Sequence, residues 1–264
     1  MTRTLTLVLA LFALLVGGDA WAADVTLTTS DGVKIHATYN EVKGAKGGVV
    51  LTHMLKKGSS DWRYLADKIN AAGLSTIAVD LRKQGANVPE GTTVEIADTE
   101  YPLMVNDVKA AVAFLKTKGL KEVALVGASI GANLSLAVAA ADPTIKNVIL
   151  LSPGMDYKGV AVTEPIAAYG ARPLLVVVSK DDPYSAKTGL FLDSQAKGPH
   201  VLKIYDTAGH GTVMLNKAPD LESLIVSWLL GSYAISDSSG ARTEEAIQTG
   251  PSGTVTTTGK RMGE

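Results

Sequence analysis

The twelve residues from Glu122 to Asn133, EVALVGASIGAN, decide the fold of this 264-residue chain. The apolar run Val123–Val126 is typical of a buried strand in a parallel sheet. The small-residue stretch Ile130–Ala141 that follows is typical of a helix packed closely against such a sheet. Between them lies Gly127-Ala128-Ser129-Ile130-Gly131, a G-x-S-x-G pattern at a strand-to-helix junction.

This junction predicts an exposed and reactive serine hydroxyl. A sharp strand-to-helix turn lifts the Ser129 Oγ above the carboxyl ends of the strands, and Gly127 and Gly131 leave room for neighbouring backbone. The start of the following helix faces any negative charge that develops there. In a chain with 26 glycines the motif alone is weak, and a capping serine in a glycine-rich turn is the alternative. Its position between strand and helix makes Ser129 the predicted nucleophile.

The rest of the chain repeats the alternation of strand and helix. Apolar runs predict further buried strands at 48–51, 76–81, 148–151 and 174–178, and a more alternating strand at 201–205. Apolar residues at helical spacing predict helices over 62–69, 104–115, 130–141 and 221–229. Two strands of period two, at 25–29 and 33–39, flank Ser30-Asp31-Gly32 and predict a hairpin. We therefore expect an α/β fold: a mostly parallel twisted sheet with helices on both faces and an N-terminal antiparallel hairpin.

Both ends of the chain differ in composition from its centre. Arg3, a short apolar stretch over 5–16 and Ala20-Trp21-Ala22 predict a signal peptide over residues 1–22 and export to the periplasm or the medium. An uncleaved anchor is the alternative, but the stretch is shorter than the roughly 20 apolar residues of a membrane span. Residues 24–233 form the predicted domain. Residues 236–264, rich in Ser, Thr, Gly and charge, predict a flexible tail.

Composition excludes several classes of function. The formal net charge of -1 gives no reason to expect nucleic acid or an anionic membrane as a partner. The absence of cysteine excludes disulfides and a cysteine nucleophile. The sequence contains no metal-ligand spacing, phosphate-binding loop or dinucleotide fingerprint, so we expect no metal and no cofactor. It does not indicate an oligomeric state.

A serine nucleophile needs a base, and the base needs a carboxylate that holds it in one tautomer. Downstream of Ser129 the only histidines are His200 and His210, and His210 lies in a small-residue loop directly after the strand at 201–205. That position is at a strand's carboxyl end, where ligands bind in such sheets, whereas His200 is at the opposite end. The sequence therefore predicts His210 as the general base.

The carboxylate is expected after the preceding strand, where Lys180-Asp181-Asp182-Pro183 follows. Asp182 is the preferred partner of His210, since the residue before proline is held extended. Asp181 stays open as an alternative. Asp206, four residues before His210, is a weaker one.

With these residues in place, the chain resembles the α/β-hydrolase superfamily over nearly the whole predicted domain. Val49 to Met54 looks like the family strand that ends in His-Gly and opens the oxyanion loop, and Asp80 to Gly85 is similar to the family's Asp-x-Arg-Gly-His-Gly turn. The resemblance implies an oxyanion hole made by the backbone N–H of Ile130 with that of Met54 or Leu55. Met54 stands where the family commonly has glycine, and Lys83-Gln84 replace Gly-His.

The resemblance implies a small esterase without a lid, similar to dienelactone-hydrolase-like proteins, although those typically use cysteine. Only Gly154 to Arg172 separate two strands at the place where relatives insert a cap domain. The expected reaction is hydrolysis of a small carboxylic ester through an acyl-serine intermediate. Thioester or amide cleavage by the same triad, and a non-catalytic binding protein, are the alternatives. Lys56, Lys57 and Lys180, on loops expected to face the site, would favour an anionic substrate unless they are simply solvated.

Overall fold

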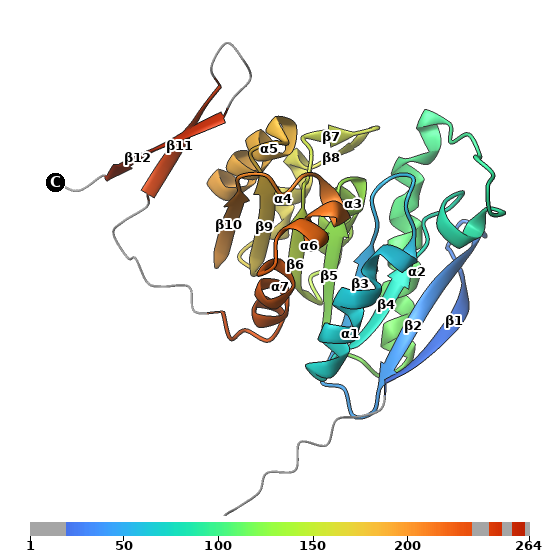
Figure 1. Cartoon of the computed structure of the whole chain (residues 1–264). Coiled ribbons are helices and arrows are strands. Elements are labelled where there is room, and N and C mark those ends of the chain that lie inside the picture. The colour runs from blue at the N-terminus through green and yellow to red at the C-terminus, as the bar shows by residue number, and fades with distance from the viewer. Residues whose placement is uncertain (1–19, 234–242, 250–254, 262–264) are drawn as a thin grey trace, which may run out of the picture.

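The computed structural model describes residues 20–233, 243–249 and 255–261 of the chain (Figure 1). Residues 1–19 of the predicted signal peptide lie outside the described residues. Residues 20–22 belong to the first strand, which begins five residues before the expected start at Val25. None of the helices in the described ranges has the length and apolar character that crossing a bilayer requires.

An eight-stranded sheet forms the centre of the molecule (Figure 1). Its spatial order is β1 (Ala20–Thr28), β2 (Lys34–Val42), β4 (Ser75–Val79), β3 (Gly48–Thr52), β5 (Val123–Ala128), β6 (Ile145–Leu151), β9 (Leu174–Ser179) and β10 (His200–Tyr205). The β1–β2 and β2–β4 pairings are antiparallel, and the other pairings are parallel. The predicted fold class is confirmed, including the N-terminal hairpin.

Helices cover both faces of this sheet, and the strand residues alternate between the two resulting cores. One core contains side chains of α2 (Val105–Thr117), α3 (Ile130–Ala141), α4 (Thr163–Tyr169) and α5 (Pro183–Gln195). The other contains side chains of α1 (Arg63–Ala71), α6 (Met214–Lys217) and α7 (Leu221–Leu229). In β5, for example, Leu125 belongs to the first core and Val126 to the second. Burial on both faces explains why the central strands are continuous apolar runs.

The order of the strands predicts a ligand site at the carboxyl ends of β3 and β5. The chain runs from β3 outward to β4, then returns through α2 to β5 on the other side of β3. Strand order therefore reverses between β3 and β5, and ligands of open α/β sheets bind outside the carboxyl ends of strands at such a reversal. Thr52 ends β3 and Ser129 follows β5, so the predicted nucleophile and the predicted oxyanion loop meet at this point.

Several elements of the structure do not follow from the sequence pattern. The apolar residues of α5 are spread around the helix, so this helix was not predicted. Between β6 and β9 lie the short strands β7 (Asp156–Tyr157) and β8 (Val160–Ala161) as well as α4. Short 3₁₀ helices occur at Ser59–Trp62, Gly85–Asn87, Asp98–Glu100, Pro102–Met104 and Gly211–Val213.

The structure describes two segments of the predicted tail. These segments, β11 (Thr243–Thr249) and β12 (Val255–Arg261), pair as an antiparallel sheet of their own. Both are rich in threonine, a β-branched residue that favours strands. The composition of residues 236–264 reflects their overall polarity and does not register this local preference.

Candidate active site

Ser129 has the strained backbone that its position in the sequence predicts. Its φ of 55° and ψ of -122° lie in a region that side-chain-bearing residues rarely adopt. Such a conformation costs on the order of 1–3 kcal/mol and persists only where the surrounding structure enforces it. Here the Ser129 N–H donates to the Leu151 carbonyl at 2.8 Å, which ties the turn to the end of β6. The strain is thus maintained by contacts on either side of the turn.

The two glycines of the motif allow a close approach of three backbone segments. A Cβ on Gly127 would lie 2.1 Å from the Gly131 carbonyl oxygen, within the turn itself. A Cβ on Gly131 would lie 2.4 Å from the carbonyl oxygen of Thr52 and 2.6 Å from that of His53. Helix α3 therefore begins in direct contact with the end of β3, where the predicted oxyanion loop starts.

His210 and Asp182 are brought together by the loops that follow β10 and β9. The His210 Nδ1 lies 2.6 Å from the Asp182 Oδ2, and the His210 side chain is 39% exposed. Burial raises the pKa of Asp182, but hydrogen bonds from His210 and Ser185 outweigh it and hold this pKa below its usual range. An ionised Asp182 fixes the tautomer with a proton on Nδ1, which leaves the His210 Nε2 available as a base.

The other acidic residues considered from the sequence have different partners. The Asp181 Oδ1 accepts from the Gly209 N–H at 3.0 Å and from the Ser179 hydroxyl at 2.5 Å, so Asp181 holds the loop before His210. Asp206 is 81% exposed and pairs with Lys180 at 2.7 Å. At the opposite end of β10, His200 contacts the Gly198 carbonyl at 2.7 Å.

A tyrosine that sequence reasoning missed lies beside this pair. Within the described residues no direct hydrogen bond joins the Ser129 hydroxyl to His210, although such bonds often tighten only when substrate binds. The ring of Tyr157 meets the His210 ring edge-on, with centroids 6.3 Å apart, and its hydroxyl lies 3.2 Å from the Ser185 Oγ. Nothing in the local sequence of β7 distinguishes Tyr157 from an ordinary strand residue.

The predicted oxyanion loop is held by a buried histidine. The Leu81 N–H donates to the His53 Nε2 at 2.9 Å, so the ring proton is on Nδ1, which donates to the Met54 carbonyl at 2.7 Å. Complete burial lowers the pKa of His53 and keeps it neutral. Because the C=O and N–H of a trans peptide point in opposite directions, the bond to the Met54 carbonyl turns the Leu55 N–H away from His53.

The departures from the family pattern have a structural explanation. The Met54 side chain packs against Gly211, where a Cβ would lie 2.4 Å from the Met54 sulfur, so it fills space beside the histidine loop. Gln84 is buried, and its Oε1 accepts from the backbone N–H of Lys56 at 2.9 Å. Lys56 has a φ of 62°, and this hydrogen bond supports the strained residue that follows Leu55. Gln84 thus supports the predicted oxyanion loop directly.

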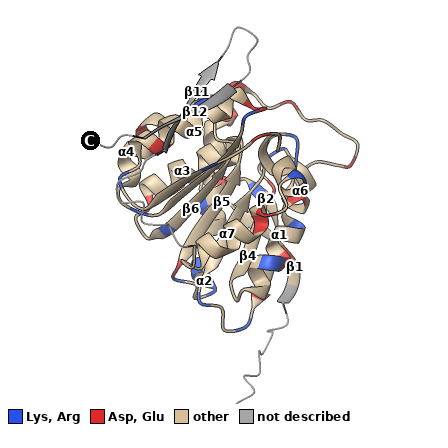
Figure 2. Ribbon diagram, turned by 60° about the vertical axis from the view of Figure 1, so that its left-hand side comes forward, with Lys and Arg blue, Asp and Glu red and all other residues tan. Residues whose placement is uncertain are grey.

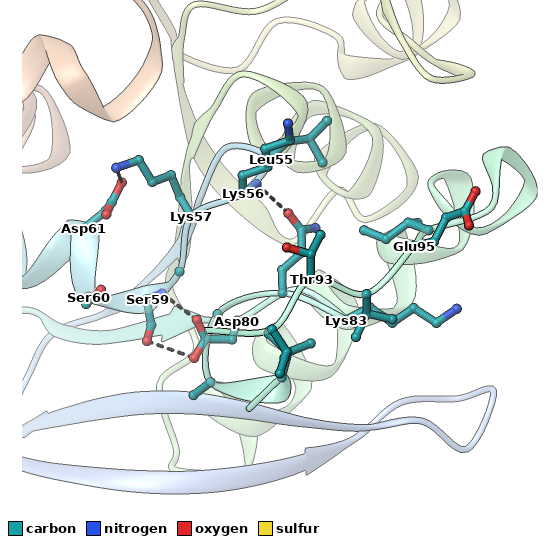
Figure 3. Close-up of a pocket in the computed structure, with 18 of the residues that line it drawn as sticks. Leu55, Lys56, Lys57, Ser59, Ser60, Asp61, Asp80, Lys83, Thr93 and Glu95 are labelled. Carbon is teal, nitrogen blue, oxygen red and sulfur yellow. Dashed lines mark hydrogen bonds and ion pairs between the residues drawn. The ribbon is translucent and has the colours of Figure 1, made fainter. Parts of the chain in front are cut away.

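A cavity of about 790 Å³ lies beside the oxyanion loop (Figure 3). It is enclosed by the loop from Leu55 to Asp61 and the segments that follow β4, with Val94, Ile96 and Tyr101 among its apolar lining. Ser129, Asp182 and His210 are not part of its wall, and the cavity meets the oxyanion loop at Leu55. Its size is that of a pocket for a small organic molecule.

Charges around the cavity are balanced. The cationic residues Lys56, Lys57 and Lys83 line it together with the carboxylates Asp61, Asp80 and Glu95. Lys57 lies 4.0 Å from Asp61, and Lys83 pairs with Glu100 at 2.7 Å. Figure 2 likewise shows basic and acidic residues interspersed along the chain. In the part of the chain that the structure describes, no group of three or more His, Asp or Glu residues is arranged to hold a metal ion.

Comparison with known proteins agrees with this fold. A family model described as alpha/beta hydrolase fold matches residues 49–168, which contain all of β3 but its first residue, the serine turn and the β7–β8 hairpin. This chain has the α/β-hydrolase fold. No curated protein matches the sequence significantly.

Solved structures with the same fold cover most of the chain. A dienelactone hydrolase from Anabaena variabilis aligns with a TM-score of 0.66 at 22% identity, covering 80% of this chain and 98% of its own. An esterase from Pyrococcus furiosus aligns with a TM-score of 0.65 at 17% identity, covering 80% of this chain and 91% of the esterase chain. A serine hydrolase from Cycloclasticus zankles aligns with a TM-score of 0.65 at 13% identity, covering 81% of this chain and 100% of the hydrolase chain.

Proposed function

We propose that this α/β-hydrolase-fold protein is an exported serine hydrolase that cleaves carboxylic esters. One observation carries the proposal: a serine in strained backbone at the start of α3, on the same sheet edge as a hydrogen-bonded Asp182–His210 pair. The esterase and dienelactone hydrolase among the similar structures support ester chemistry for the fold. Their identities are low, so the assignment to this chain depends on its own residues.

The proposed reaction has two steps. In acylation the Ser129 Oγ attacks the ester carbonyl carbon, its proton passes to the His210 Nε2, and that proton leaves with the alcohol as the C–O bond breaks. In deacylation water attacks the acyl-serine, gives a proton to His210, and the Ser129 Oγ departs and regains that proton. The N–H groups of Ile130 and of Met54 or Leu55 stabilise the oxyanion formed in each step.

The cavity beside Leu55 supports a neutral substrate with an apolar group. Val94, Ile96 and Tyr101 offer apolar contact, and the opposed charges of the lining leave little net positive potential. Lys180 is paired with Asp206 and Lys57 lies close to Asp61, so two of the three lysines expected to attract an anion have carboxylate partners. We therefore favour uncharged esters over the anionic substrates that the sequence left open.

A fluorophosphonate probe tests the proposal directly, because it reacts covalently with activated serines. We expect labelling of the wild type and none of Ser129→Ala, with both proteins giving the same circular dichroism spectrum. A panel of p-nitrophenyl esters of increasing acyl length, with a dicarboxylic monoester as the charged member, then tests the substrate class. A folded wild type that is neither labelled nor active on any ester would refute the proposal.

Export is tested separately by fractionation. The full-length chain expressed in a Gram-negative host is expected in the periplasm with residues 1–22 removed, because the leader has the three parts that a signal peptidase requires. Mass spectrometry of the recovered protein gives the new N-terminus. Retention of the intact chain in the membrane fraction would indicate an uncleaved anchor.

A further inference from the structure

Ser152, the residue that follows β6, lies between the proposed nucleophile and the proposed base. The carbonyl of Leu151, to which Ser152 is joined by a peptide bond, accepts from the Ser129 N–H at 2.8 Å. The Ser152 Oγ accepts from the Gly211 N–H at 2.9 Å, and Gly211 is the residue after His210. Two adjacent hydrogen bonds at the end of β6 therefore connect the serine turn to the chain beside the base.

Ser152 is fully buried, and its backbone is strained. Its φ of 50° lies in the left-handed region, which residues with a side chain rarely adopt and which persists only where the surrounding structure enforces it. The Ser152 N–H donates to the Val177 carbonyl at 2.8 Å, which fixes this backbone to β9. Glycine would adopt the same φ without steric cost, so the backbone conformation does not require serine. What serine adds at this position is its Oγ, which accepts from the Gly211 N–H.

The contacts of the Ser152 hydroxyl leave its oxygen available as an acceptor. Its proton is donated to the Met214 Sδ at 3.3 Å, and a thioether sulfur is only a weak acceptor. The stronger contact is therefore the one that the Oγ receives from the Gly211 N–H. Gly211 is buried, so removal of the Ser152 Oγ would leave a buried N–H without its protein partner, which is costly.

His210 lies between two glycines whose backbone has positive φ, 79° at Gly209 and 60° at Gly211. Side chains that follow neighbouring strands hold both glycines. The Gly209 N–H donates to the Asp181 Oδ1 at 3.0 Å, before His210, and the Gly211 N–H donates to the Ser152 Oγ, after His210. Because glycine restricts the backbone least, these two bonds limit the movement of the imidazole.

We propose that Ser152 is a positioning residue, which holds His210 at its working distance from Ser129 through the Gly211 N–H. This inference rests on the proposed function. Ser152 exchanges no proton in either step, and it acts only by fixing the backbone next to the base. A displacement of about 1 Å between reacting groups can cost about a hundredfold in rate. Since acylation and deacylation both use His210, the loss of the Ser152 Oγ should slow both steps by a similar factor.

Ser152→Ala and Ser152→Gly test this role together, because both remove the Oγ but only glycine relieves the backbone strain. We expect each variant to lower kcat on p-nitrophenyl butyrate by about 10- to 100-fold and to keep KM within about twofold of the wild type. The rate constant for fluorophosphonate labelling should fall by the same factor, while the final extent of labelling stays complete. Ser152→Gly should have the higher thermal midpoint, since alanine is strained at positive φ. Activity would then not follow stability.

Ser75→Ala is the matched control. The Ser75 Oγ is buried and accepts from the Val42 N–H at 3.0 Å, at the amino end of β4 and thus at the opposite edge of the sheet from the site. Its loss should also lower the thermal midpoint, because a buried N–H again loses its partner. The kcat and the labelling rate should stay within about twofold of the wild type, since no residue of the proposed triad is displaced.

Three results would overturn the inference. They are a wild-type kcat in Ser152→Gly, an equal loss of kcat in Ser75→Ala, and labelling of Ser152→Gly that is incomplete but proceeds at the wild-type rate. The last result would mean that Ser152 only stabilises the fold. A wild type that the fluorophosphonate does not label would instead contradict the proposed function.

Discussion

Two aspartate–histidine pairs lie on opposite sides of the central strands β3 and β5. In each pair the histidine Nδ1 lies 2.6 Å from a carboxylate Oδ2: His210 with Asp182, and His36 with Asp80. A serine accompanies each pair, Ser129 in the first and Ser59 in the second. By distance and residue type alone, the two clusters would qualify equally as catalytic.

They differ in what occupies the second imidazole nitrogen. The His36 Nε2 faces Asp24 at 3.1 Å, so both ring nitrogens of His36 have carboxylate partners. Ser59 donates its hydroxyl to the Asp80 Oδ2 at 3.0 Å and its backbone N–H to the Asp80 Oδ1 at 2.6 Å, so this serine bonds to the acid rather than to the base. A histidine whose two ring nitrogens both face carboxylates has no nitrogen left to take a proton from a nucleophile, so the His36 pair is suited to stability and the His210 pair to the proposed reaction.

Replacing each histidine by glutamine should separate catalysis from stability. We expect His210→Gln to lower kcat by about a millionfold, the typical loss when a triad base is removed, with a thermal midpoint close to that of the wild type. His36→Gln should keep activity within about threefold and lose about 1–2 kcal/mol of unfolding free energy, because it breaks contacts between β2 and the loop after β4. Ester kinetics and urea titrations measure both quantities. Equal losses of activity in the two variants would contradict the assignment of catalysis to His210 and of stability to His36.

The neighbouring aspartates Asp181 and Asp182 provide the next test. Asp182→Asn should lower kcat by about 10⁴-fold, because an amide partner stabilises the wrong tautomer of His210. Asp181→Asn should cost about tenfold or less, since it weakens one hydrogen bond to the Gly209 N–H in the loop before His210. Steady-state kinetics on the same ester decide between them. A larger loss in Asp181→Asn would transfer the role of triad acid to Asp181.

For stability, the carboxylate of Asp80 should matter more than that of Asp182. Asp80 is 1% exposed and accepts hydrogen bonds from His36 and from both the backbone and the hydroxyl of Ser59. Asp80→Asn is therefore expected to cost about 2–3 kcal/mol of unfolding free energy, and Asp182→Asn only about 1 kcal/mol. Urea midpoints at unchanged m-value give the comparison. If Asp182→Asn proves the more destabilised variant, the Asp80 cluster is not the structural one.

The smallest expected effect is a difference in acid sensitivity. The pKa of Asp182 is lowered in the folded state, so its ionisation contributes stability above its unfolded pKa of about 3.9. That contribution is lost as pH falls through the lowered folded value. The difference in unfolding free energy between the wild type and Asp182→Asn should therefore shrink as pH decreases below about 4. A difference that stays constant or grows on acidification would contradict the lowered pKa.

Sequence reasoning was most accurate where the signal is local. The apolar runs of β3, β5 and β9 follow from burial on both faces of a parallel sheet, and the serine turn follows from glycines flanking Ser129. It was least accurate for α5 and the β7–β8 hairpin. The apolar residues of α5 form no single stripe, and strands of two residues are too short to show a period.

The sequence by itself therefore determined the layered α/β fold, the strained position of Ser129 and the chain order of acid and base, because neighbouring residues encode burial and backbone conformation. Only the tertiary structure decided that Asp182 contacts His210 while Asp181 contacts Gly209. It also decided that Asn133 holds the β7–β8 hairpin, whose Tyr157 ring packs edge-on against His210. These contacts join loops that are distant along the chain. They depend on the order of strands in the sheet, which no local pattern of residues specifies.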